Sequence, residues 1–487
     1  MTSLAEERRE QERWRPLRRD PLYAHFDRVL ENEFLPREEQ ESRIAARLAR
    51  MVAFAAEHVP YYRDLFASLK LSPAVIAGPQ SLPLLPELDK AAIRREDARL
   101  CPPALPPGEA AAGFNKSSGS TGVPTRIFRS QHSRLMDLVF EQRQLRWYRF
   151  DPMGSTASIR MAKDLPHVRP GVLLAVGQTV TLKGWPYLNR WFATGPFAGF
   201  ADTNPLAAKL AWLERHKPNY LRISSGALEH LAFAFEGDAR RIEMRGLRAA
   251  AEPMTPGMEA RIEKTFGVPV NISFGMDEVG WIATRCGAGR YHVHAERFIV
   301  EIVDESGKPV SPGDFGRVLI TDIGNFAMPL IRYVTDDVAR AAAAPCPCGR
   351  TLPVMGEVIG RYSQMSGLPE GTMDLVWALR RAMEELPPEL AKPLRAYQIR
   401  QTASGDFKLH LVTAGPLAAG FAAYAEEHWR RALAARDSAG AAPAFSLREV
   451  TAIPLAPSGK FFHFVSEIAR PREGKDYAGR AAKEPRS

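Results

Sequence analysis

The pattern of hydrophobic and polar residues changes character along the chain. Residues 1–70 interleave charged side chains with Leu, Val, Ala and Phe, as helices do. From about residue 150 to 340, β-like runs such as GVLLAVG, VPVNISFG and GRVLITD alternate with amphipathic stretches such as LAAKLAWLERH and MEARIEKTFG. Such alternation is typical of α/β proteins. The pattern therefore predicts a large α/β domain.

The pattern changes again after Arg361. The amphipathic stretch MDLVWALRRAMEEL is followed by the hairpin-like AYQIRQTASGDFKLHLVT, by FAAYAEEHWRRALAA and by the strand-like FSLREVTAIP. The β-β-α-β order predicts a small α+β domain of roughly 110 to 130 residues, an ordinary domain size. We therefore divide the chain into a large N-terminal domain, residues 1–361, and a small C-terminal domain, residues 362–487.

Composition and charge add few restrictions. The 487 residues contain no apolar stretch long enough to span a membrane, and the charged N-terminus does not resemble a secretory signal. We expect a cytoplasmic protein without a membrane partner. The net charge of +9 would attract anionic ligands such as nucleotides, although a high Arg and Ala content explains it equally well. No run of like charges marks a nucleic-acid-binding tail, so no specific nucleic-acid partner is expected.

A loop of small residues follows Asn115 and Lys116. It consists of Ser117, Ser118, Gly119, Ser120, Thr121 and Gly122. Glycine lets a ligand approach the backbone closely, and the hydroxyl groups are hydrogen-bond donors. Successive backbone N–H groups in such a loop form a nest for an anion, and phosphate is the natural guest. It is not a Walker loop, because the chain contains no G-x-x-x-x-G-K-[ST] sequence. A flexible surface loop is the alternative interpretation.

Three further motifs follow this loop in order. Residues 273–278 read SFGMDE, residues 329–337 read PLIRYVTDD, and residues 457–460 read PSGK. Taken singly, a carboxylate after a strand and a lysine in a turn are usually solvated surface residues. Taken together with the loop, the motifs resemble the adenylate-forming superfamily of acyl-CoA synthetases and ligases. Within it, the chain looks most similar to the phenylacetate–CoA ligase and capsule-biosynthesis branch.

The resemblance implies an ATP site in the large domain. Loop 117–122 would hold the phosphates, Phe274 would stack near adenine, and Glu278 would help to hold Mg²⁺ on the phosphates. Asp337 would accept hydrogen bonds from the ribose hydroxyls, a role that suits a carboxylate. The other residues that the resemblance places at ATP are Ala251, Glu252 and Pro253 of a turn beside adenine, Ser273, Gly275, Met276 and Asp277 of the aromatic–glycine motif, and Arg361 at the end of the large domain.

The resemblance also implies a two-step reaction. A small carboxylic acid attacks the α-phosphate of ATP and releases pyrophosphate. The resemblance to this branch favours an aryl acid as that substrate. Coenzyme A then takes the acyl group from the acyl-AMP. Lys460, carried by a mobile C-terminal domain, would meet the negative charge that builds up in the first step, so Lys460 and Glu278 are the catalytic candidates. The acid pocket would lie beside the aromatic–glycine motif and residues 223–226, and the branch favours a homodimer.

Some positions depart from the family pattern. Val123 stands where a lysine is usual, a loss for which Lys116 or Arg126 are candidate replacements. Asp277 replaces a hydroxyl residue and Asp336 replaces a glycine. Residues 362–364 read YSQ where one or two acidic hinge residues are usual, which concerns the second half-reaction.

These departures leave alternatives open. The acyl acceptor is expected to be coenzyme A, but an amine, another nitrogen nucleophile or a carrier-protein thiol of a natural-product pathway is the alternative. A degenerate nucleotide-binding protein without catalysis is the alternative from a different class. The loss at Val123 favours it, whereas the retention of Glu278, Asp337 and Lys460 argues against it.

The four cysteines are too few for a disulfide framework. Three thiolates and one imidazole suffice for a closed tetrahedral zinc site, and the candidates are Cys286, His292, Cys346 and Cys348. The same branch carries a similar cysteine and histidine and a later CPCGRT, so the resemblance implies structural zinc. His294 is the rival ligand, and free buried cysteines are the alternative. A closed site has no open coordination position, so we assign the metal no catalytic role.

Overall fold

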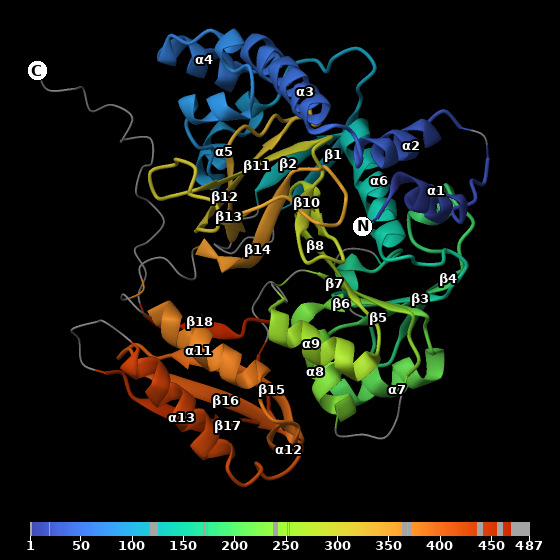
Figure 1. Ribbon diagram of the computed structural model, residues 1–487. Coiled ribbons are helices and arrows are strands. Elements are labelled where there is room, and N and C mark those ends of the chain that lie inside the picture. Colours follow the sequence, from blue (N-terminus) through green and yellow to red (C-terminus); the bar gives the residue numbers. More distant parts are fainter. Residues whose placement is uncertain are drawn as a thin grey trace, which may run out of the picture.

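The computed structural model describes residues 2–18, 20–116, 125–168, 172, 174–236, 242–250, 252, 254–362, 368, 372–435, 442–454 and 461–468 (Figure 1). Helices open the chain, as predicted for residues 1–70: α1 (Leu4–Glu12), α2 (Tyr23–Asn32), α3 (Arg37–His58) and α4 (Pro60–Leu69). Ser3 caps α1, because its hydroxyl accepts from the Glu6 N–H while the Glu6 carboxylate accepts from the Ser3 N–H at 2.8 Å. No helix within these ranges is long and apolar enough to cross a membrane.

A small hairpin and a long helix follow these N-terminal helices. The elements are α5 (Lys90–Glu96), β1 (Ala111–Lys116), β2 (Arg126–Ser130) and α6 (Gln131–Trp147). Short 3₁₀ helices lie at η1 (Pro73–Val75), η2 (Pro79–Leu84), η3 (Asp97–Leu100), η4 (Ala162–Asp164) and η5 (Leu188–Arg190). β1 and β2 pair antiparallel, and Lys116 faces Arg126 in register. The two ends of the predicted phosphate loop therefore lie side by side.

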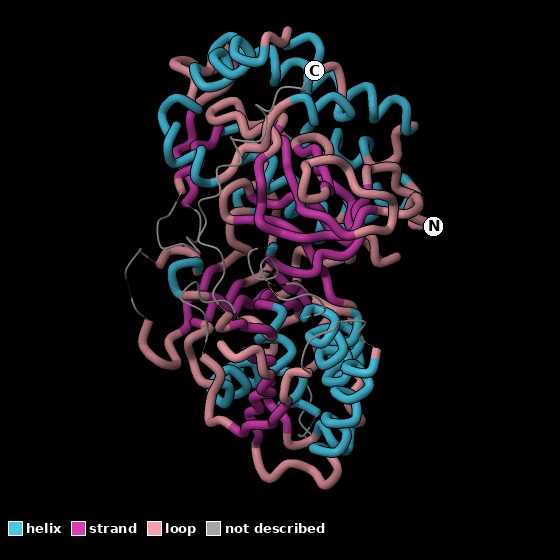
Figure 2. The backbone as a smooth tube through the Cα atoms, turned by 90° about the vertical axis from the view of Figure 1, so that its left-hand side faces the viewer, coloured by secondary structure: helices cyan, strands magenta, loops and turns pink. Residues whose placement is uncertain are grey.

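A large mixed sheet forms the centre of the molecule. Its strands, in the order β11-β12-β13-β14-β10-β9-β8-β7-β6-β3-β5-β4, are β3 (Thr156–Arg160), β4 (Thr179–Leu182), β5 (Phe197–Ala201), β6 (Tyr220–Ser224), β7 (Gly246–Ala250), β8 (Val270–Met276), β9 (Gly280–Arg285), β10 (Tyr291–Val293), β11 (Phe298–Val303), β12 (Phe315–Asp322), β13 (Tyr333–Ala341) and β14 (Val354–Arg361). Helices α7 (Leu206–His216), α8 (Ser225–Glu236) and α9 (Pro256–Phe266) connect its parallel strands. Figure 2 shows strands in the middle and helices around them.

The predicted α/β class is confirmed, but the alternation of strands and helices ends at β8. From β3 to β8 the neighbouring strands β5, β3, β6, β7 and β8 run parallel, whereas from β8 to β14 each pair is antiparallel. Antiparallel strands need only a short connection, while parallel ones need a crossover helix. The run at residues 171–177, which looked β-like, is not a strand where it is described, and β4 begins at Thr179 instead.

The C-terminal residues form a smaller sheet with its own helices. The elements are α11 (Thr372–Glu384), α12 (Pro388–Ala391), β15 (Leu394–Gln401), β16 (Phe407–Thr413), α13 (Phe421–Ala434), β17 (Phe445–Glu449) and β18 (Phe464–Ser466). The strand order is β17-β16-β15-β18. A separate hydrophobic cluster fills this part and takes in Phe233 of α8. In Figure 1 it lies beside α8 and α9. The boundary at residues 361 and 362 stays a prediction.

Candidate active site

A cavity lies where the large sheet meets the small domain. Its walls come from β8, β13, β14, α11 and the residues that lead into β18. Of the residues predicted to contact ATP, the lining includes Glu252, Ser273, Phe274, Gly275, Asp337 and Arg361. Phe461, the residue after Lys460 in the chain, lines the same cavity. The structure thus brings together side chains from motifs that are far apart in the sequence.

Several predicted site residues cannot be placed. Ser117 to Gly122, Val123, Ala251, Pro253 and Lys460 lie outside the described residues, as do Ser363 and Gln364. Met276 ends β8, and Asp277 is exposed in the turn that follows it.

Asp337 and Arg361 form the polar floor of the cavity. They are partners in register on β13 and β14, and Nε of Arg361 lies 3.1 Å from Oδ1 of Asp337. The negative charge of Asp337 raises the pKa of Arg361, so this guanidinium stays charged. Asp337, the residue predicted to bind the ribose, is therefore held in position by the charged guanidinium of Arg361.

Tyr333 is a candidate contact to which the sequence assigned no role. Its side chain is fully buried, and its hydroxyl has no hydrogen-bond partner among the described residues. Burial first, and then the charge of Glu278, raises the pKa of Tyr333 well above its usual value, so the hydroxyl remains a donor. An unpaired buried donor beside Glu278, Asp337 and Arg361 suits a phosphate or ribose oxygen. Its only sequence signal is its place inside the run at residues 329–337.

Asp336 occupies a backbone conformation that favours glycine. Its φ is 69°, in the left-handed region, which explains why the family carries glycine at this position. Aspartate tolerates this region better than most residues, but strain of roughly 1–3 kcal/mol is usual for a non-glycine residue. Its Oδ2 also lies 3.7 Å from NH1 of Arg361.

We expect Asp336→Gly to raise the free energy of unfolding by about 0.5–1 kcal/mol. Relief of strain outweighs the added freedom of glycine in the unfolded chain. Asp336→Ala is the matched control, because it removes the same carboxylate but retains Cβ. Thermal unfolding should rank glycine above both aspartate and alanine at this position. An alanine variant as stable as the glycine variant would assign the effect to charge rather than to backbone strain.

Glu278 lies close enough to Tyr333 and Arg361 to act on both, and it has a cationic partner. Its side chain is buried, and Nζ of Lys90, at the start of α5, lies 3.2 Å from its Oε1. Nδ2 of Asn115 donates to the carbonyl oxygen of Asp277 at 2.8 Å. Because Asn115 and Lys116 end β1, the predicted phosphate loop leaves the described chain beside Glu278. The contact with Lys90 has no signal in the sequence.

Lys116 and Arg126 are the two candidates for the positive charge that is missing at Val123, and the structure favours one of them. Arg126 donates to Oδ2 of Asp97 at 2.5 Å, so its charge already has a partner. Nζ of Lys116 lies 5.9 Å from the centre of the Phe114 ring, at the start of the loop. Lys116 is therefore the better candidate.

Glu252 ties the small domain to the large one. Its Oε1 accepts the backbone N–H of Phe461 at 2.6 Å, and its Oε2 accepts that of Gly226 at 2.7 Å. Two residues after Phe461, Nε2 of His463 lies 2.7 Å from Oε2 of Glu229 on α8, and both side chains are buried. These contacts hold the residues after Lys460 against the cavity.

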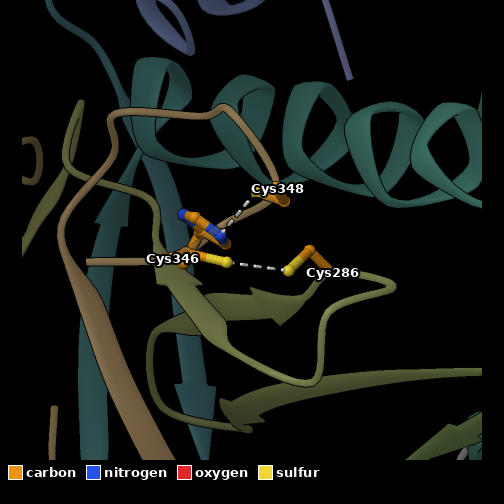
Figure 3. A group of neighbouring side chains, drawn as sticks. Cys286, Cys346 and Cys348 are labelled. Carbon is orange, nitrogen blue, oxygen red and sulfur yellow. Dashed lines mark hydrogen bonds between the residues drawn. The ribbon is translucent and has the colours of Figure 1, made fainter. Parts of the chain in front are cut away.

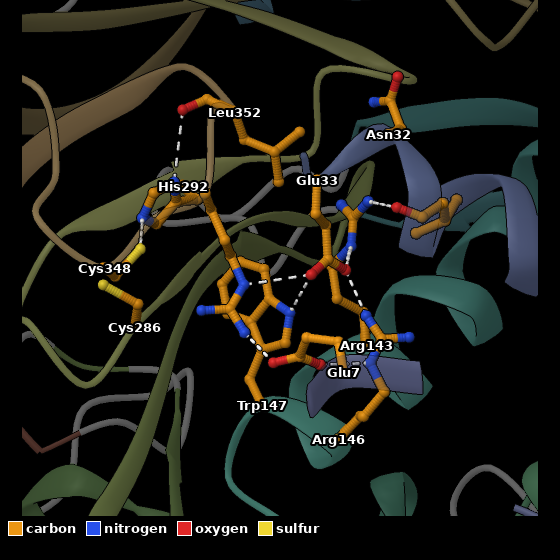
Figure 4. Close-up of polar contacts among 12 residues, drawn as sticks. Glu7, Asn32, Glu33, Arg143, Arg146, Trp147, Cys286, His292, Cys348 and Leu352 are labelled. Atoms are coloured by element: carbon orange, nitrogen blue, oxygen red, sulfur yellow. Dashed lines mark hydrogen bonds and ion pairs between the residues drawn. The ribbon is translucent and has the colours of Figure 1, made fainter. Parts of the chain in front are cut away.

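The four predicted metal ligands gather at one point (Figure 3). Their Sγ and nitrogen atoms lie within 4.8 Å of one another, and Sγ of Cys286 is 3.4 Å from Sγ of Cys346. Sγ of Cys348 is 3.3 Å from Nε2 of His292. A hydrogen bond with Cys348 is the main cause that lowers the pKa of Cys286 to about 7. Nδ1 of His292 lies 3.3 Å from the carbonyl oxygen of Leu352, which orients the ring (Figure 4).

His294 lies outside this cluster. Its Nδ1 is 2.9 Å from NH1 of Arg143 and its Nε2 is 3.2 Å from Oγ1 of Thr284, while its ring stacks on Phe140. His292 is thus the histidine that the structure places with the three cysteines. Such a set of soft thiolates and one imidazole fits tetrahedral zinc.

Comparisons with known proteins identify the fold and the class of relatives. No protein-family profile matches the chain. In fold it is similar to a 2-hydroxyisobutyryl-CoA ligase in the postadenylation state with its acyl-AMP, with 16% identity, a TM-score of 0.66 and coverage of 90% of this chain and 91% of the other. It is also similar to the anthranilate CoA ligase AuaEII with anthranoyl-AMP, with 15% identity, a TM-score of 0.50 and coverage of 82% and 75%. The fold is therefore that of adenylate-forming CoA ligases.

Relatives in sequence indicate which group of adenylate-forming ligases the chain resembles. The chain is 28% identical over 347 residues to a phenylacetate–coenzyme A ligase of Thermus thermophilus, covering 69% of this chain and 73% of that protein. It is 27% identical over 329 residues to the phenylacetate–coenzyme A ligase of Escherichia coli, covering 66% and 70%. The resemblance to the adenylate-forming superfamily and its phenylacetate–CoA ligase branch is confirmed.

Proposed function

We propose that this protein is an AMP-forming ligase that activates a small carboxylic acid with MgATP and transfers the acyl group to coenzyme A. The observation that carries the proposal is the cavity shared by the aromatic–glycine motif, the Asp337–Arg361 pair and Phe461, the residue that follows Lys460. Two motifs expected to bind the nucleotide meet there, together with the residue that directly follows the lysine motif. The ligases that resemble this chain in sequence and in fold support the same reaction.

The nucleotide would bind along the large-domain wall. Phe274 offers a ring for adenine, and Asp337 offers two carboxylate oxygens to the ribose hydroxyls. Arg361 holds Asp337 in place and supplies positive charge near the phosphates. The Tyr333 hydroxyl remains protonated and is available as a further donor.

Glu278 is the side chain that fits Mg²⁺. Hard cations prefer carboxylate oxygens, and Glu278 carries a buried carboxylate. Its backbone oxygen accepts from Nδ2 of Asn115, near the end of β1 where the phosphate loop begins. Mg²⁺ on the phosphates supplies charge neutralisation for in-line displacement. Nζ of Lys90 lies 3.2 Å from Oε1 of Glu278 and offsets its negative charge within the protein.

The substrate carboxylate then attacks the α-phosphorus, and the bond between the α- and β-phosphates breaks to release pyrophosphate. The protein contributes position and charge, because no protein nucleophile is required. Lys460 is the proposed charge at the reacting oxygens. In the second step the coenzyme A thiol attacks the acyl carbon and AMP leaves.

We further propose that Cys286, His292, Cys346 and Cys348 hold a structural zinc ion, that the enzyme works in the reducing cytoplasm, and that it forms a homodimer. The zinc proposal is supported by the convergence of the four ligand atoms and by the Leu352 carbonyl behind His292. Zinc would link β9, β10 and the connection between β13 and β14. A closed four-ligand site supplies no catalytic water.

The test is acid-dependent pyrophosphate release from MgATP. Wild-type protein is assayed with a panel of aryl, amino-aryl and aliphatic acids, each with and without coenzyme A. We expect release with a subset of the acids and formation of the corresponding thioester. Parallel traps with hydroxylamine, primary amines and a phosphopantetheinyl carrier protein identify the acceptor.

Two results would overturn the proposal. ATP binding without pyrophosphate release for any acid class would indicate a nucleotide-binding protein without catalysis. Release followed by transfer to an amine or a carrier protein, but not to coenzyme A, would retain adenylation and replace the acceptor. Asp337→Ala should weaken ATP binding in either case, because the ribose loses its acceptor.

A further inference from the structure

A row of polar side chains crosses the parallel half of the large sheet. Ser158 of β3, Arg222 of β6, Arg248 of β7 and Asn271 of β8 are successive partners in register. Arg160, two residues after Ser158, lies on the same face because side chains alternate along a strand. Nδ2 of Asn271 donates to the carbonyl oxygen of Gln144 at 3.0 Å, so α6 covers this face.

Positive charge exceeds negative charge in this row. Arg248 is well paired, with NH1 2.9 Å from Oε1 of Glu141 and NH2 3.3 Å from Oε1 of Gln144. Arg222 reaches the same Glu141 oxygen only at 3.7 Å, and within the described structure this is its one ion pair. The guanidinium groups of Arg248 and Arg222, and more distantly that of Arg160, therefore act on one largely buried carboxylate, that of Glu141.

The second arginine at the row's edge is also weakly compensated. NH2 of Arg160 lies 3.9 Å from Oδ2 of Asp164, and both side chains are about one-third exposed. Burial first, and then the charges of Arg160 and Arg248, lower the pKa of Arg222. A charge without a close partner in a partly buried place is costly unless a ligand compensates it.

Two buried polar atoms along this row have no hydrogen-bond partner among the described residues, one at its β3 end and one at its β7–β8 end. They are Oγ of Ser158, whose residue is 5% exposed, and Nε2 of Gln144, whose residue is fully buried. Both can donate a hydrogen bond. Buried donors in native proteins are almost always satisfied by protein, water or ligand. An unsatisfied donor at Ser158, in register with the weakly paired Arg222, is what an anion would complete.

The row adjoins the wall of the active-site cavity. The Arg222 guanidinium lies 5.3 Å from the centre of the Trp281 ring. Trp281 pairs with Gly275, and a Cβ on Gly275 would lie 3.1 Å from Trp281 atoms. Gly275 itself lines the cavity, and the Arg222 side chain is 21% exposed, so solvent reaches it.

We propose that Arg222, together with Arg160 and Ser158, binds a second carboxylate at the far end of the acid that the enzyme activates. This inference rests on the proposed adenylation and names its substrate class as dicarboxylic acids. A guanidinium matches a carboxylate with two parallel hydrogen bonds, and Ser158 adds a hydroxyl donor. A monocarboxylic acid would leave Arg222 without this partner, so the enzyme should discriminate strongly in favour of dicarboxylic acids.

Matched acid pairs test this substrate class. We measure kcat/KM for pyrophosphate release with phenylacetate against its 3-carboxy and 4-carboxy derivatives, and with hexanoate against adipate. Wild-type protein should prefer the better diacid of a pair by about 10²-fold. In Arg222→Met the preference should fall to about one or below, with Arg222→Lys in between.

The control is Arg245→Met, because Arg245 is exposed and lies 3.9 Å from Asp151, away from the row. It should retain the wild-type ratio. Thermal unfolding of each variant, with and without 4-carboxyphenylacetate, separates lost binding from lost folding: the diacid should raise the wild-type Tm and leave Arg222→Met unchanged.

Equal or better use of the monoacids by wild type would overturn the inference while leaving adenylation intact. A diacid preference that survives in a folded Arg222→Met protein would also overturn it. Absence of release with every acid of the wider panel would instead overturn the proposed adenylation, while diacid stabilisation of wild type alone would still support the anion site.

Discussion

Replacing Lys460 by alanine is expected to lower kcat for acyl-adenylate formation by about 10²–10³-fold. The lysine charge would be used where negative charge builds up between the substrate carboxylate and the α-phosphate. The nucleotide is held by other groups, with Asp337 at the ribose and Phe274 at adenine. We therefore expect the dissociation constant of ATP to change little.

The contacts around Phe461 explain why a lysine at this place would act on the cavity. The Phe461 N–H donates to Glu252, and His463 is paired with the buried Glu229. Both acceptors belong to the large domain, so the residues after Lys460 are docked beside the Asp337–Arg361 pair. A lysine on a mobile arm gains its effect only when such contacts bring the arm to the reacting atoms.

The measurement separates the two half-reactions. Pyrophosphate release at saturating acid and ATP reports the first, and thioester formation from synthetic acyl-AMP and coenzyme A reports the second. Lys460→Ala should lose the first and retain most of the second. Lys392→Ala, an exposed lysine of the same domain, is the control and should retain both. Wild-type pyrophosphate release by the alanine variant would remove Lys460 from the mechanism.

The fold was predictable to the extent that local patterns specify it. Alternating strands and amphipathic helices between residues 197 and 276 correspond to the parallel strands β5 to β8, whereas β4 pairs antiparallel with β5. The antiparallel half was not distinguished, because a buried strand reads the same whether its neighbour is parallel or antiparallel. The difference lies in connection length, and β8 to β10 are joined by short turns rather than helices.

Motif residues could be identified from the sequence, but the contacts that set their position and their electrostatic surroundings could not. Asp337 and Glu278 stand inside recognisable runs, and Asp336 was visible as a departure whose meaning, a positive φ, needed the backbone. Lys90 meets Glu278 only through the tertiary fold, and its sequence surroundings contain no motif. Arg222 is likewise one arginine among many until strand register aligns it with Arg248.

The cysteine cluster shows the same division between residue type and placement. The sequence supplied three cysteines and two nearby histidines, but spacing alone could not choose between the histidines. His292 lies in β10 and His294 directly follows its last residue, so the two positions are only two residues apart. The choice follows from the fold, in which Arg143 and Thr284 contact His294 and the thiols contact His292.

Removal of zinc is expected to destabilise the protein far more than any single surface change. The metal would join Cys286 at the end of β9, His292 on β10, and Cys346 and Cys348 in the connection between β13 and β14. Without it, nothing would join these three segments through their side chains except weak contacts between neighbouring sulfur and nitrogen atoms. We expect Cys348→Ser to lower the free energy of unfolding by on the order of 5 kcal/mol and Tm by about 10 °C.

The effect should extend to the N-terminal helices. The Thr2 N–H donates to the Cys348 carbonyl oxygen at 2.8 Å, and Arg350 of the same connection pairs with Glu7 of α1 and with Glu33 after α2. Figure 4 shows these glutamates between the metal cluster and the arginines of α6. Loss of the metal loosens the connection and so removes partners from two buried carboxylates, a costly change.

The measurements are metal content and amide hydrogen exchange. Wild type should contain one zinc ion per chain, and Cys348→Ser should contain little and exchange faster in α1 and α2. Cys101→Ser is the matched control, because Cys101 is a partly buried thiol outside the cluster, and it should retain zinc and wild-type exchange. A Cys348→Ser protein with full zinc content, or a metal-free protein as stable as wild type, would contradict the structural role. Because the closed site has no open coordination position, the rate of adenylation per folded molecule should be nearly unchanged below the lowered Tm.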